Sequence, residues 1–216
     1  MDMPRYQEIR FTDIAFDYDP YSPRVGTPRG NFGFVVFGWW RGIRVAVKIL
    51  PSNGPGFEAA FHRECSILQT VRQAIDGNID GSRHLLVVYG YGTEVRAPPC
   101  QSVHFIVMEH LSGATLKDIM ASGQLALDVL LRAAHQLAGG LAALAAEQIV
   151  HADVHCGNVM FRSAGGELVL VDYGLSRIFN RGPNVLLYPG QRRGFEYLVA
   201  PELLDDTHMN TSATDV

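Results

Sequence analysis

The chain has 216 residues, of which 47% are hydrophobic, and its 18 Lys and Arg against 22 Asp and Glu give a formal net charge of −4. That composition is typical of a folded protein with one large domain or two small lobes, and the acidic balance argues against nucleic-acid or anionic-membrane partners. Cys65, Cys100 and Cys156 are an odd number with no CxxC spacing, which argues against a disulfide framework and a zinc site, so we expect a soluble cytoplasmic protein with reduced thiols.

Residues 1–24 form an N-terminal extension in our division of the chain. The opening sequence MDMPRYQEIRFTD carries charges where a signal peptide needs an apolar run, so we expect neither a leader nor a membrane partner. Phe11, Ile14 and Phe16 alternate imperfectly and are compatible with one added strand.

The segment from Asn31 to Leu50, NFGFVVFGWWRGIRVAVKIL, predicts two strands around a turn at Arg41-Gly42. A period of two places Ala46 and Lys48 on one face of the second strand. The valines and isoleucine between them face the opposite side and are expected to pack inward. Most lysines on strands are simply solvated, so Lys48 needs a second observation before it indicates a site.

A glycine-rich stretch precedes this hairpin. Gly30, Phe32, Gly33 and Val35 fit the later part of a GxGxxGxV loop, in which glycines let backbone amides approach phosphates. Taken alone, the pattern is more often just the turn at the start of a hairpin.

A helix of about 17 residues is expected next, because apolar residues recur at helical spacing. They are Phe57, Ala60, Phe61, Leu68 and Val71. With about 100° per residue, Glu64 lies near the centre of this stripe and Glu58 about 120° away. A carboxylate on an apolar face is costly unless it is paired. Lys48 is the cation that we expect Glu64 to pair with.

The rest of the chain predicts two strands, a long helix and a second hairpin. The strands are expected at Leu85 to Tyr89 and Val103 to Met108. A buried helix is expected from an Ala- and Leu-rich stripe, which consists of Leu127, Leu130, Leu131, Ala134, Ala138, Leu141 and Ala145. Strands at Val159–Phe161 and Leu168–Tyr173 flank a turn, and strand register then places position 158 opposite about position 172.

Several motifs, in order along the chain, resemble those of protein kinases. Lys48 in VAVK and Glu64 in FHREC resemble the strand lysine and helix glutamate of that family. IVMEHL resembles the hinge between the lobes, and HADVHCGN resembles the catalytic loop. VDYGLSR resembles the DFG motif, with Tyr173 in place of Phe. FEYLVAPELL resembles the segment that contains the APE motif, at Ala200, Pro201 and Glu202.

The resemblance implies a site that uses ATP and Mg²⁺. In the family's pattern, Lys48 and Glu64 hold the α- and β-phosphates, and Asp153 accepts or orients the proton of the substrate hydroxyl. Asn158 and Asp172 ligate Mg²⁺. The remaining nucleotide contacts are Gly30, Phe32, Gly33, Val35, Ala46, the gatekeeper Met108, and the backbone of Glu109 and Leu111.

The implied fold class is α+β, a bilobal protein-kinase-like fold. Residues 25–108 form an N-lobe with an antiparallel sheet and one main helix. Residues 109–216 form a partial, helical C-lobe that ends after the APE motif, without the final helices. We therefore expect a protein substrate or a partner kinase, and a dimer that covers the shortened lobe.

Two residues depart from the family's pattern in the catalytic loop. Ala152 replaces the arginine that reads a phosphate on the activation segment, so we expect activity without phosphorylation of that segment. His155 replaces the lysine that steadies the γ-phosphate, and at pH 7 an imidazole supplies less positive charge. The HxDxH spacing also resembles small-molecule phosphotransferases.

Three functions therefore stay open. The first is an active protein kinase that phosphorylates Ser, Thr or Tyr. The second is a pseudokinase or kinase-like binding module, which the short lower lobe favours. The third is a small-molecule kinase of related fold, which His155 suggests, whereas the APE segment favours a protein substrate.

Overall fold

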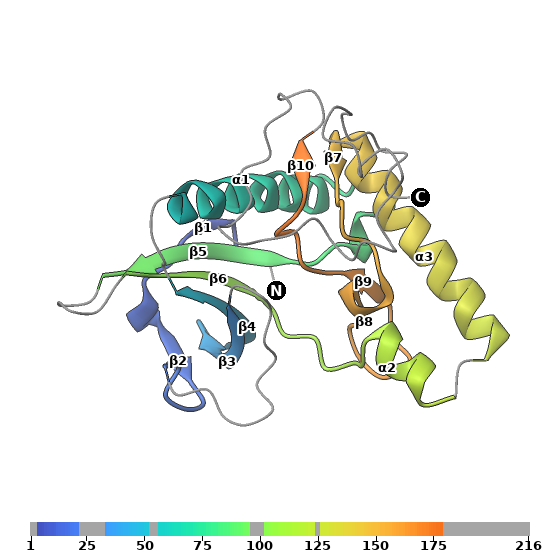
Figure 1. Ribbon diagram of the computed structural model, residues 1–216, viewed down its shortest axis with the longest axis horizontal. Coiled ribbons are helices and arrows are strands. Elements are labelled where there is room, and N and C mark those ends of the chain that lie inside the picture. Colours follow the sequence, from blue (N-terminus) through green and yellow to red (C-terminus); the bar gives the residue numbers. More distant parts are fainter. Residues whose placement is uncertain (1–3, 22–32, 52–55, 96–101, 124–125, 179–216) are drawn as a thin grey trace. The chain divides into compact units, whose positions relative to one another are not determined.

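A computed structural model describes residues 4–21, 33–51, 56–95, 102–123 and 126–178 (Figure 1). The chain divides into two compact units, with one boundary inside the first long helix. The first unit holds the described residues up to Cys65 together with Val87–His110, and the second holds Ser66–Leu86 and the described residues from Leu111 onward. Each unit has its own apolar core. The proposed lobe boundaries at residues 25 and 109 remain a prediction.

A six-stranded sheet forms the first unit, with the order β1-β5-β6-β4-β3-β2. Its strands are β1 (Gln7–Glu8), β2 (Ile14–Phe16), β3 (Phe34–Trp40), β4 (Ile43–Pro51), β5 (Val88–Glu94) and β6 (Val103–Glu109). All neighbouring pairs are antiparallel except β1 and β5, which pair in parallel. The predicted antiparallel sheet is therefore present, with one parallel strand at its edge.

The predicted hairpin corresponds to β3 and β4. Its two-residue turn has Arg41 at φ 50° and Gly42 at φ 75°. Positive φ at both central residues is the mark of a type I′ turn, whose twist matches that of the flanking strands. Val45, Val47 and Ile49 are buried, as the alternation in the sequence predicts.

Helix α1 (Phe57–Asp76) is three residues longer than the predicted 17, at 20 residues. Every apolar residue of the predicted stripe is buried. In the first unit, Phe61 stacks on His104 of β6 with ring centroids 4.5 Å apart, and Phe57 stacks on the same imidazole at 5.9 Å. These contacts fix the start of α1 against the sheet.

The second unit is built around α3 (Leu127–Ala146). It also contains the short helices η2 (Ser82–His84), α2 (Leu116–Ala121) and η3 (Cys156–Asn158). Its strands pair as two small antiparallel sheets, and these consist of β7 (Ile149–Val150) with β10 (Arg177–Ile178), and β8 (Val159–Phe161) with β9 (Leu168–Leu170). The second predicted hairpin is thus present as β8 and β9.

The predicted buried face of α3 was wrong. Leu127, Leu130 and Leu131 of the predicted stripe are 69%, 41% and 61% exposed, whereas the buried residues are Ala133, Gly140, Ala143 and Leu144. The small residues of this other face allow close packing: a Cβ on Gly81, beside η2, would lie 2.1 Å from the carbonyl oxygen of Gly139. Apolar residues occupy more than one face of α3, so their spacing alone does not select the face that packs.

α3 is also long and apolar enough to cross a membrane by length and composition alone. The buried core helix of a globular protein meets the same criterion, and α3 packs against η2, β7 and β9. The cytoplasmic location expected from the sequence therefore remains a prediction.

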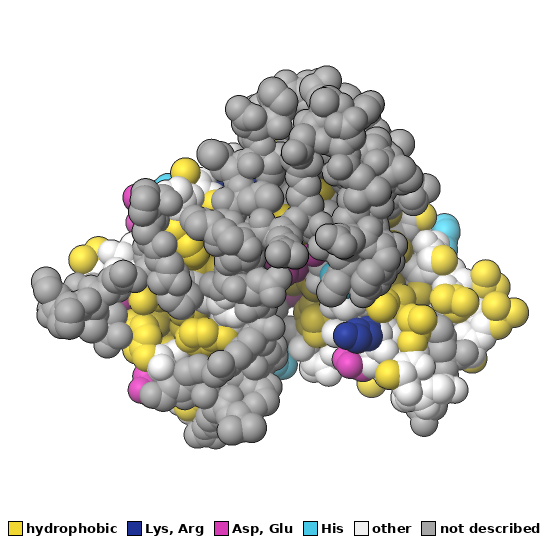
Figure 2. All heavy atoms as spheres, in the orientation of Figure 1, with side chains coloured by type: hydrophobic (Ala, Val, Ile, Leu, Met, Phe, Trp, Pro, Cys, Tyr) yellow, Lys and Arg dark blue, Asp and Glu magenta, His cyan; other side chains and the backbone are white. Residues whose placement is uncertain are grey.

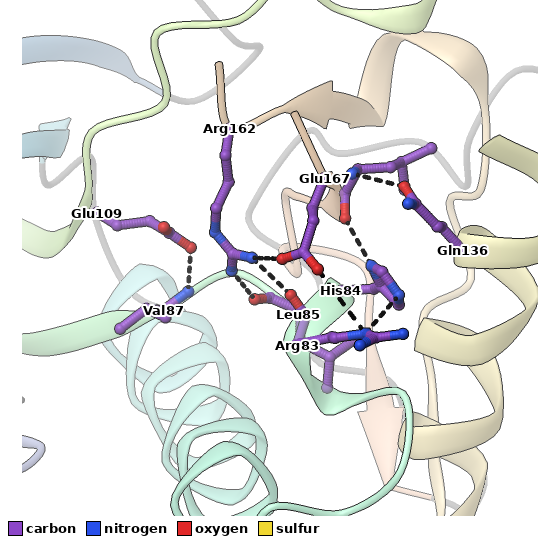
Figure 3. Close-up of polar contacts among 9 residues, drawn as sticks. Arg83, His84, Leu85, Val87, Glu109, Gln136, Arg162 and Glu167 are labelled. Atoms are coloured by element: carbon purple, nitrogen blue, oxygen red, sulfur yellow. Dashed lines mark hydrogen bonds and ion pairs between the residues drawn. The ribbon is translucent and has the colours of Figure 1, made fainter. Parts of the chain in front are cut away.

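A polar cluster joins η2 to the β8–β9 hairpin in the second unit (Figure 3). Arg162 donates hydrogen bonds to the carbonyl oxygens of Arg83 at 2.7 Å and Leu85 at 3.2 Å, and it pairs with Glu167 at 3.3 Å. His84 lies 3.1 Å from the carbonyl oxygen of Leu168 through Nδ1. The Arg162 guanidinium therefore binds the chain just before β5. It also pairs with Glu167 within the β8–β9 hairpin, which follows the catalytic-loop motif.

Candidate functional site

The first group of predicted site residues lies on one face of the sheet in the first unit. Register places Val35, Lys48 and Ile106 side by side on β3, β4 and β6, and places Ala46 beside Met108 in the neighbouring row. Paired residues of adjacent strands point to the same side. The four predicted nucleotide contacts on these strands, Val35, Ala46, Lys48 and Met108, therefore share a face.

Lys48 and Glu64 form the predicted ion pair. Lys48 Nζ lies 2.9 Å from Glu64 Oε1, and the two side chains are 21% and 2% exposed. A buried carboxylate is held charged only by a well-placed cation. Glu64 in turn fixes the position of the Lys48 ammonium group on this face of the sheet.

Gly33, predicted from the motif as a nucleotide contact, has a structural role in the sheet. A Cβ at this position would lie 2.1 Å from the carbonyl oxygen of Ile49 on β4, so the close approach of the two strands requires glycine. Gly30 and Phe32 of the same predicted loop lie outside the described residues.

The predicted hinge residues sit at the end of β6 and just after it. The backbone N–H of Glu109 donates to the carbonyl oxygen of Val87 at 2.9 Å, and the Glu109 carboxylate accepts from the backbone N–H of Val87 at the same distance (Figure 3). This reciprocal pair orders the strand end. Leu111 belongs to the second unit.

The second group of predicted residues surrounds η3 in the second unit. Asn158 Nδ2 donates to the backbone oxygen of Asp153 at 3.0 Å and to its carboxylate Oδ2 at 2.9 Å. Both amide hydrogens are thereby used, and among the described residues no hydrogen bond reaches Asn158 Oδ1. An amide oxygen left in this way is suited to a hard cation.

Asp172 comes next to Asn158 through strand pairing. Val171 donates its N–H to the carbonyl oxygen of Asn158 at 2.9 Å, which extends the β8–β9 ladder. The predicted partner of position 158 was about 172, so the observed register differs by one residue. Asp172 has φ 65°, a left-handed conformation that Asp tolerates better than most residues. Its side chain is exposed.

The donor set fits Mg²⁺ better than a metal held wholly by protein. The described residues contain no cluster of three or more His, Cys, Asp or Glu side chains able to hold a metal. One carboxylate and one amide oxygen match the habit of Mg²⁺, which is bound through one or two protein oxygens together with phosphates and water.

Asp153 lies in a setting that favours its neutral form. Burial raises the pKa of the Asp153 carboxyl, His155 opposes the shift, and the nearby Asp172 carboxylate adds to it. His155 Nε2 lies 3.7 Å from Asp153 Oδ2, and its Nδ1 accepts from the backbone N–H of Gly157 at 3.0 Å. His155 thus caps η3 with one ring nitrogen and faces Asp153 with the other.

His151 was not assigned a role from the sequence, yet it is the most buried residue of the catalytic-loop motif. Its Nδ1 accepts from the backbone N–H of Asp153 at 3.3 Å, and its Nε2 lies 3.1 Å from the carbonyl oxygen of Val171. His151 therefore connects the backbone of Asp153 to the residue before Asp172. In the sequence, its position directly after a buried β strand was the signal that could have indicated its burial.

Tyr173 and Ser176 complete the support around His151. The Tyr173 ring meets the imidazole edge to face at 5.2 Å, and its buried hydroxyl donates to the carbonyl oxygen of Leu170 at 3.2 Å. Ser176 donates to the carbonyl oxygen of His151 at 3.0 Å. Ala200, Pro201 and Glu202 of the predicted APE motif lie outside the described residues, as does Cys100, whereas Cys65 and Cys156 are free thiols.

Comparison with known proteins gives a consistent result. Residues 25–216 match the model of the family described as protein tyrosine and serine/threonine kinase. The chain is 31% identical over 180 residues to the serine/threonine-protein kinase drp72 of Corynebacterium efficiens, covering 80% of this chain and 31% of that protein. It is 30% identical over 176 residues to PknA of Corynebacterium glutamicum, covering 80% of this chain and 34% of the relative.

A tyrosine kinase is also among the relatives. Src64B of Drosophila melanogaster is 30% identical over 154 residues, covering 69% of this chain and 25% of that protein. The matched regions thus span between a quarter and about a third of these three relatives.

Proposed function

Because the chain belongs to the protein tyrosine and serine/threonine kinase family, we propose that it is an ATP-dependent protein kinase, which transfers the γ-phosphoryl group of ATP to a protein hydroxyl group. The observation that carries the proposal is the ion pair between Lys48 and Glu64, at 2.9 Å with Glu64 2% exposed. A buried carboxylate that orients a strand lysine is what phosphate binding in this family requires.

Lys48 would bind the α- and β-phosphate oxygens, with Glu64 holding the ammonium group in place. Ala46 and Met108 lie in adjacent positions across β4 and β6 and would pack against the adenine. Two apolar side chains beside one oriented cation give a surface that is complementary to a nucleotide.

Asp153, Asn158 and Asp172 would serve the transfer itself. Asp153 would accept or orient the proton of the attacking hydroxyl. Asn158 Oδ1 and the Asp172 carboxylate would hold Mg²⁺, which when bound neutralises charge on the phosphates. The hydrogen bond from Asn158 Nδ2 to Asp153 Oδ2, 2.9 Å long, supports this role because it orients the Asp153 carboxylate.

We further propose that the acceptor is serine or threonine. The two corynebacterial relatives named as serine/threonine kinases each align with 80% of the chain, whereas the tyrosine kinase aligns with 69%. Acid hydrolysis of the labelled product followed by separation of phosphoamino acids decides this point, and phosphotyrosine alone would overturn it.

Phosphoryl transfer from γ-labelled ATP tests the proposal. Wild-type protein with Mg²⁺ is expected to label a peptide library, and Lys48→Ala and Asp172→Ala are each expected to reduce labelling by about 100-fold or more. Equal labelling by the wild type and both folded variants would contradict the proposal. Candidate aminoglycosides in parallel reactions test the alternative of a small-molecule kinase.

A second candidate function is a kinase-like binding module, which the exposed leucines of α3 favour. Leu127, Leu130 and Leu131 are at least 41% exposed, and Figure 2 shows hydrophobic side chains gathered along this helix. Exposed apolar clusters mark interaction surfaces. Nucleotide binding without detectable transfer to peptides or aminoglycosides, together with dimers in light scattering, would favour this function over catalysis.

A further inference from the structure

The segment before the family-matched region adds strands to the sheet of the first unit. The match to the kinase family begins at residue 25, yet residues 7–16 contribute β1 and β2 to the sheet. β1 pairs with β5, with Gln7 opposite Gly90 and Glu8 opposite Tyr91. The backbone N–H of Ile9 then donates to the carbonyl oxygen of Tyr91 at 2.8 Å, and Ile9 is buried.

Two glycines of β5 make room for this segment. A Cβ at Gly90 would lie 1.9 Å from the carbonyl oxygen of Gln7, and a Cβ at Gly92 would lie 2.2 Å from that of Ile9. Real Cβ atoms do not approach backbone oxygens so closely, so any other residue at either position would displace the N-terminal segment. The sequence of β5 is therefore adapted to the segment docked beside it.

Tyr6 connects this segment to α1. Its hydroxyl donates a hydrogen bond to the carbonyl oxygen of Cys65 at 2.8 Å, the residue directly after Glu64. Its ring lies 5.7 Å from that of Tyr91, and the Tyr91 ring lies 6.0 Å from that of Phe61 on α1. Burial raises the pKa of Tyr6, so the phenol remains a donor at any physiological pH.

We propose that Tyr6 is a positioning residue, which holds the turn of α1 that carries Glu64 and thereby keeps Glu64 paired with Lys48. The proposal rests on the proposed function, because it matters only if Lys48 binds nucleotide. Orientation of Glu64 depends on the rotation and position of a single helical turn. A hydrogen bond to the carbonyl oxygen of the next residue constrains that turn directly, whereas Lys48 constrains only the tip of the side chain.

A double-mutant cycle on nucleotide affinity tests the proposal, with Mg²⁺ and the ATP analogue AMP-PNP as the probe in calorimetry. Tyr6→Phe removes the hydroxyl and keeps the ring, and we expect it to weaken binding by about three- to tenfold, the range for one lost hydrogen bond. In a Glu64→Gln background the same change is expected to alter affinity by less than about twofold, because residues that act through one another are not additive.

Tyr91→Phe is the matched control. Its hydroxyl makes no hydrogen bond among the described residues, and it lies in the same aromatic cluster. We expect unchanged affinity. Amide exchange gives a second readout that needs no nucleotide: exchange in the turn around Glu64 should be faster in Tyr6→Phe and unchanged in Tyr91→Phe.

Two kinds of failure are distinguishable. Nucleotide binding that Tyr6→Phe leaves unchanged, or weakens equally in both backgrounds, overturns the positioning role while the proposed function stands. Absence of nucleotide binding by the wild type overturns both. Equal amide exchange in wild type and Tyr6→Phe likewise overturns the positioning role.

Discussion

Glu58 and Glu64 lie on the same helix, yet their side chains are 75% and 2% exposed. The difference follows from helix geometry, because only Glu64 falls within the apolar stripe of α1. Glu64 was therefore predictable from spacing before any motif was considered. Its partner was predictable for the same reason, since a buried carboxylate needs a cation and Lys48 lies on the preceding strand.

His151 shows what spacing alone does not reveal. A histidine in a short loop gives no periodicity, and its burial depends on packing beneath Tyr173, a residue distant in sequence. The hydrogen bonds to Asp153 and Val171 likewise depend on how two loops meet. The motif predicted the loop as a whole, whereas the contacts of His151 became clear only from the structure.

The buried His151 makes stability depend on pH. Burial lowers its pKa from the ordinary 6.5 to about 4, so below pH 6.5 the unfolded state takes up a proton that the folded state does not. The resulting loss of stability begins as the pH falls below 6.5 and is complete below pH 4. Between pH 7 and pH 5 we expect His151 to account for a loss of about 2 kcal/mol.

Urea unfolding of metal-free protein at both pH values measures this loss. The variant His151→Gln keeps an N–H that can donate to the carbonyl oxygen of Val171 but does not titrate. Its loss between pH 7 and pH 5 should be smaller than that of the wild type by about 2 kcal/mol. An equal loss in the two proteins would show that His151 does not titrate as expected.

At the scale of elements, regular patterns were predictable and contacts between elements were not. The β3–β4 hairpin and its turn followed from alternation and from Arg41-Gly42. The parallel strand β1 has only two residues, too short for any periodic signal. The predicted register of β8 and β9 differed from the observed register by one residue, because a turn assigned only by composition does not fix which residue lies at its centre.

The Arg162 cluster is the contact between elements that most needs a test. Arg162→Met keeps most of the apolar length of the side chain but leaves the carbonyl oxygens of Arg83 and Leu85 without their guanidinium donor. We expect the free energy of unfolding to fall by about 1–3 kcal/mol, the cost of losing hydrogen bonds to a charged group. Denaturant unfolding at pH 7 measures it.

Arg132→Met is the matched control on α3. Arg132 pairs with Asp128 at 2.9 Å, but both side chains are about 70% exposed, and exposed pairs contribute little. We expect a change within about 0.5 kcal/mol. Comparable losses in the two variants would indicate that the Arg162 contacts are no stronger than a surface ion pair.

At the scale of the whole molecule, the fold class and family followed from several motifs in the right order, each on the expected element. The face of α3 that packs in the second unit did not follow, because Ala and Leu occupy more than one face of that helix. A strand near Ile14–Phe16 was compatible with the sequence and is present as β2. The pairing of β1 with β5 did not follow, since its signal is a pair of glycines on β5 whose need is clear only beside Gln7 and Ile9. The sequence thus predicted the family and the fold class better than the packing between elements.

We propose as the central claim that this chain binds a magnesium-nucleotide complex and that Asp172 holds the Mg²⁺. Calorimetric titration with AMP-PNP, with Mg²⁺ and again with EDTA, tests it most directly, beside Asp172→Asn and the exposed control Asp128→Asn. We predict that Mg²⁺ raises the affinity of the wild type and of Asp128→Asn by about tenfold or more, and that Asp172→Asn loses this increase. A wild type that binds no nucleotide, or an Asp172→Asn variant that keeps the full magnesium effect, would contradict the claim.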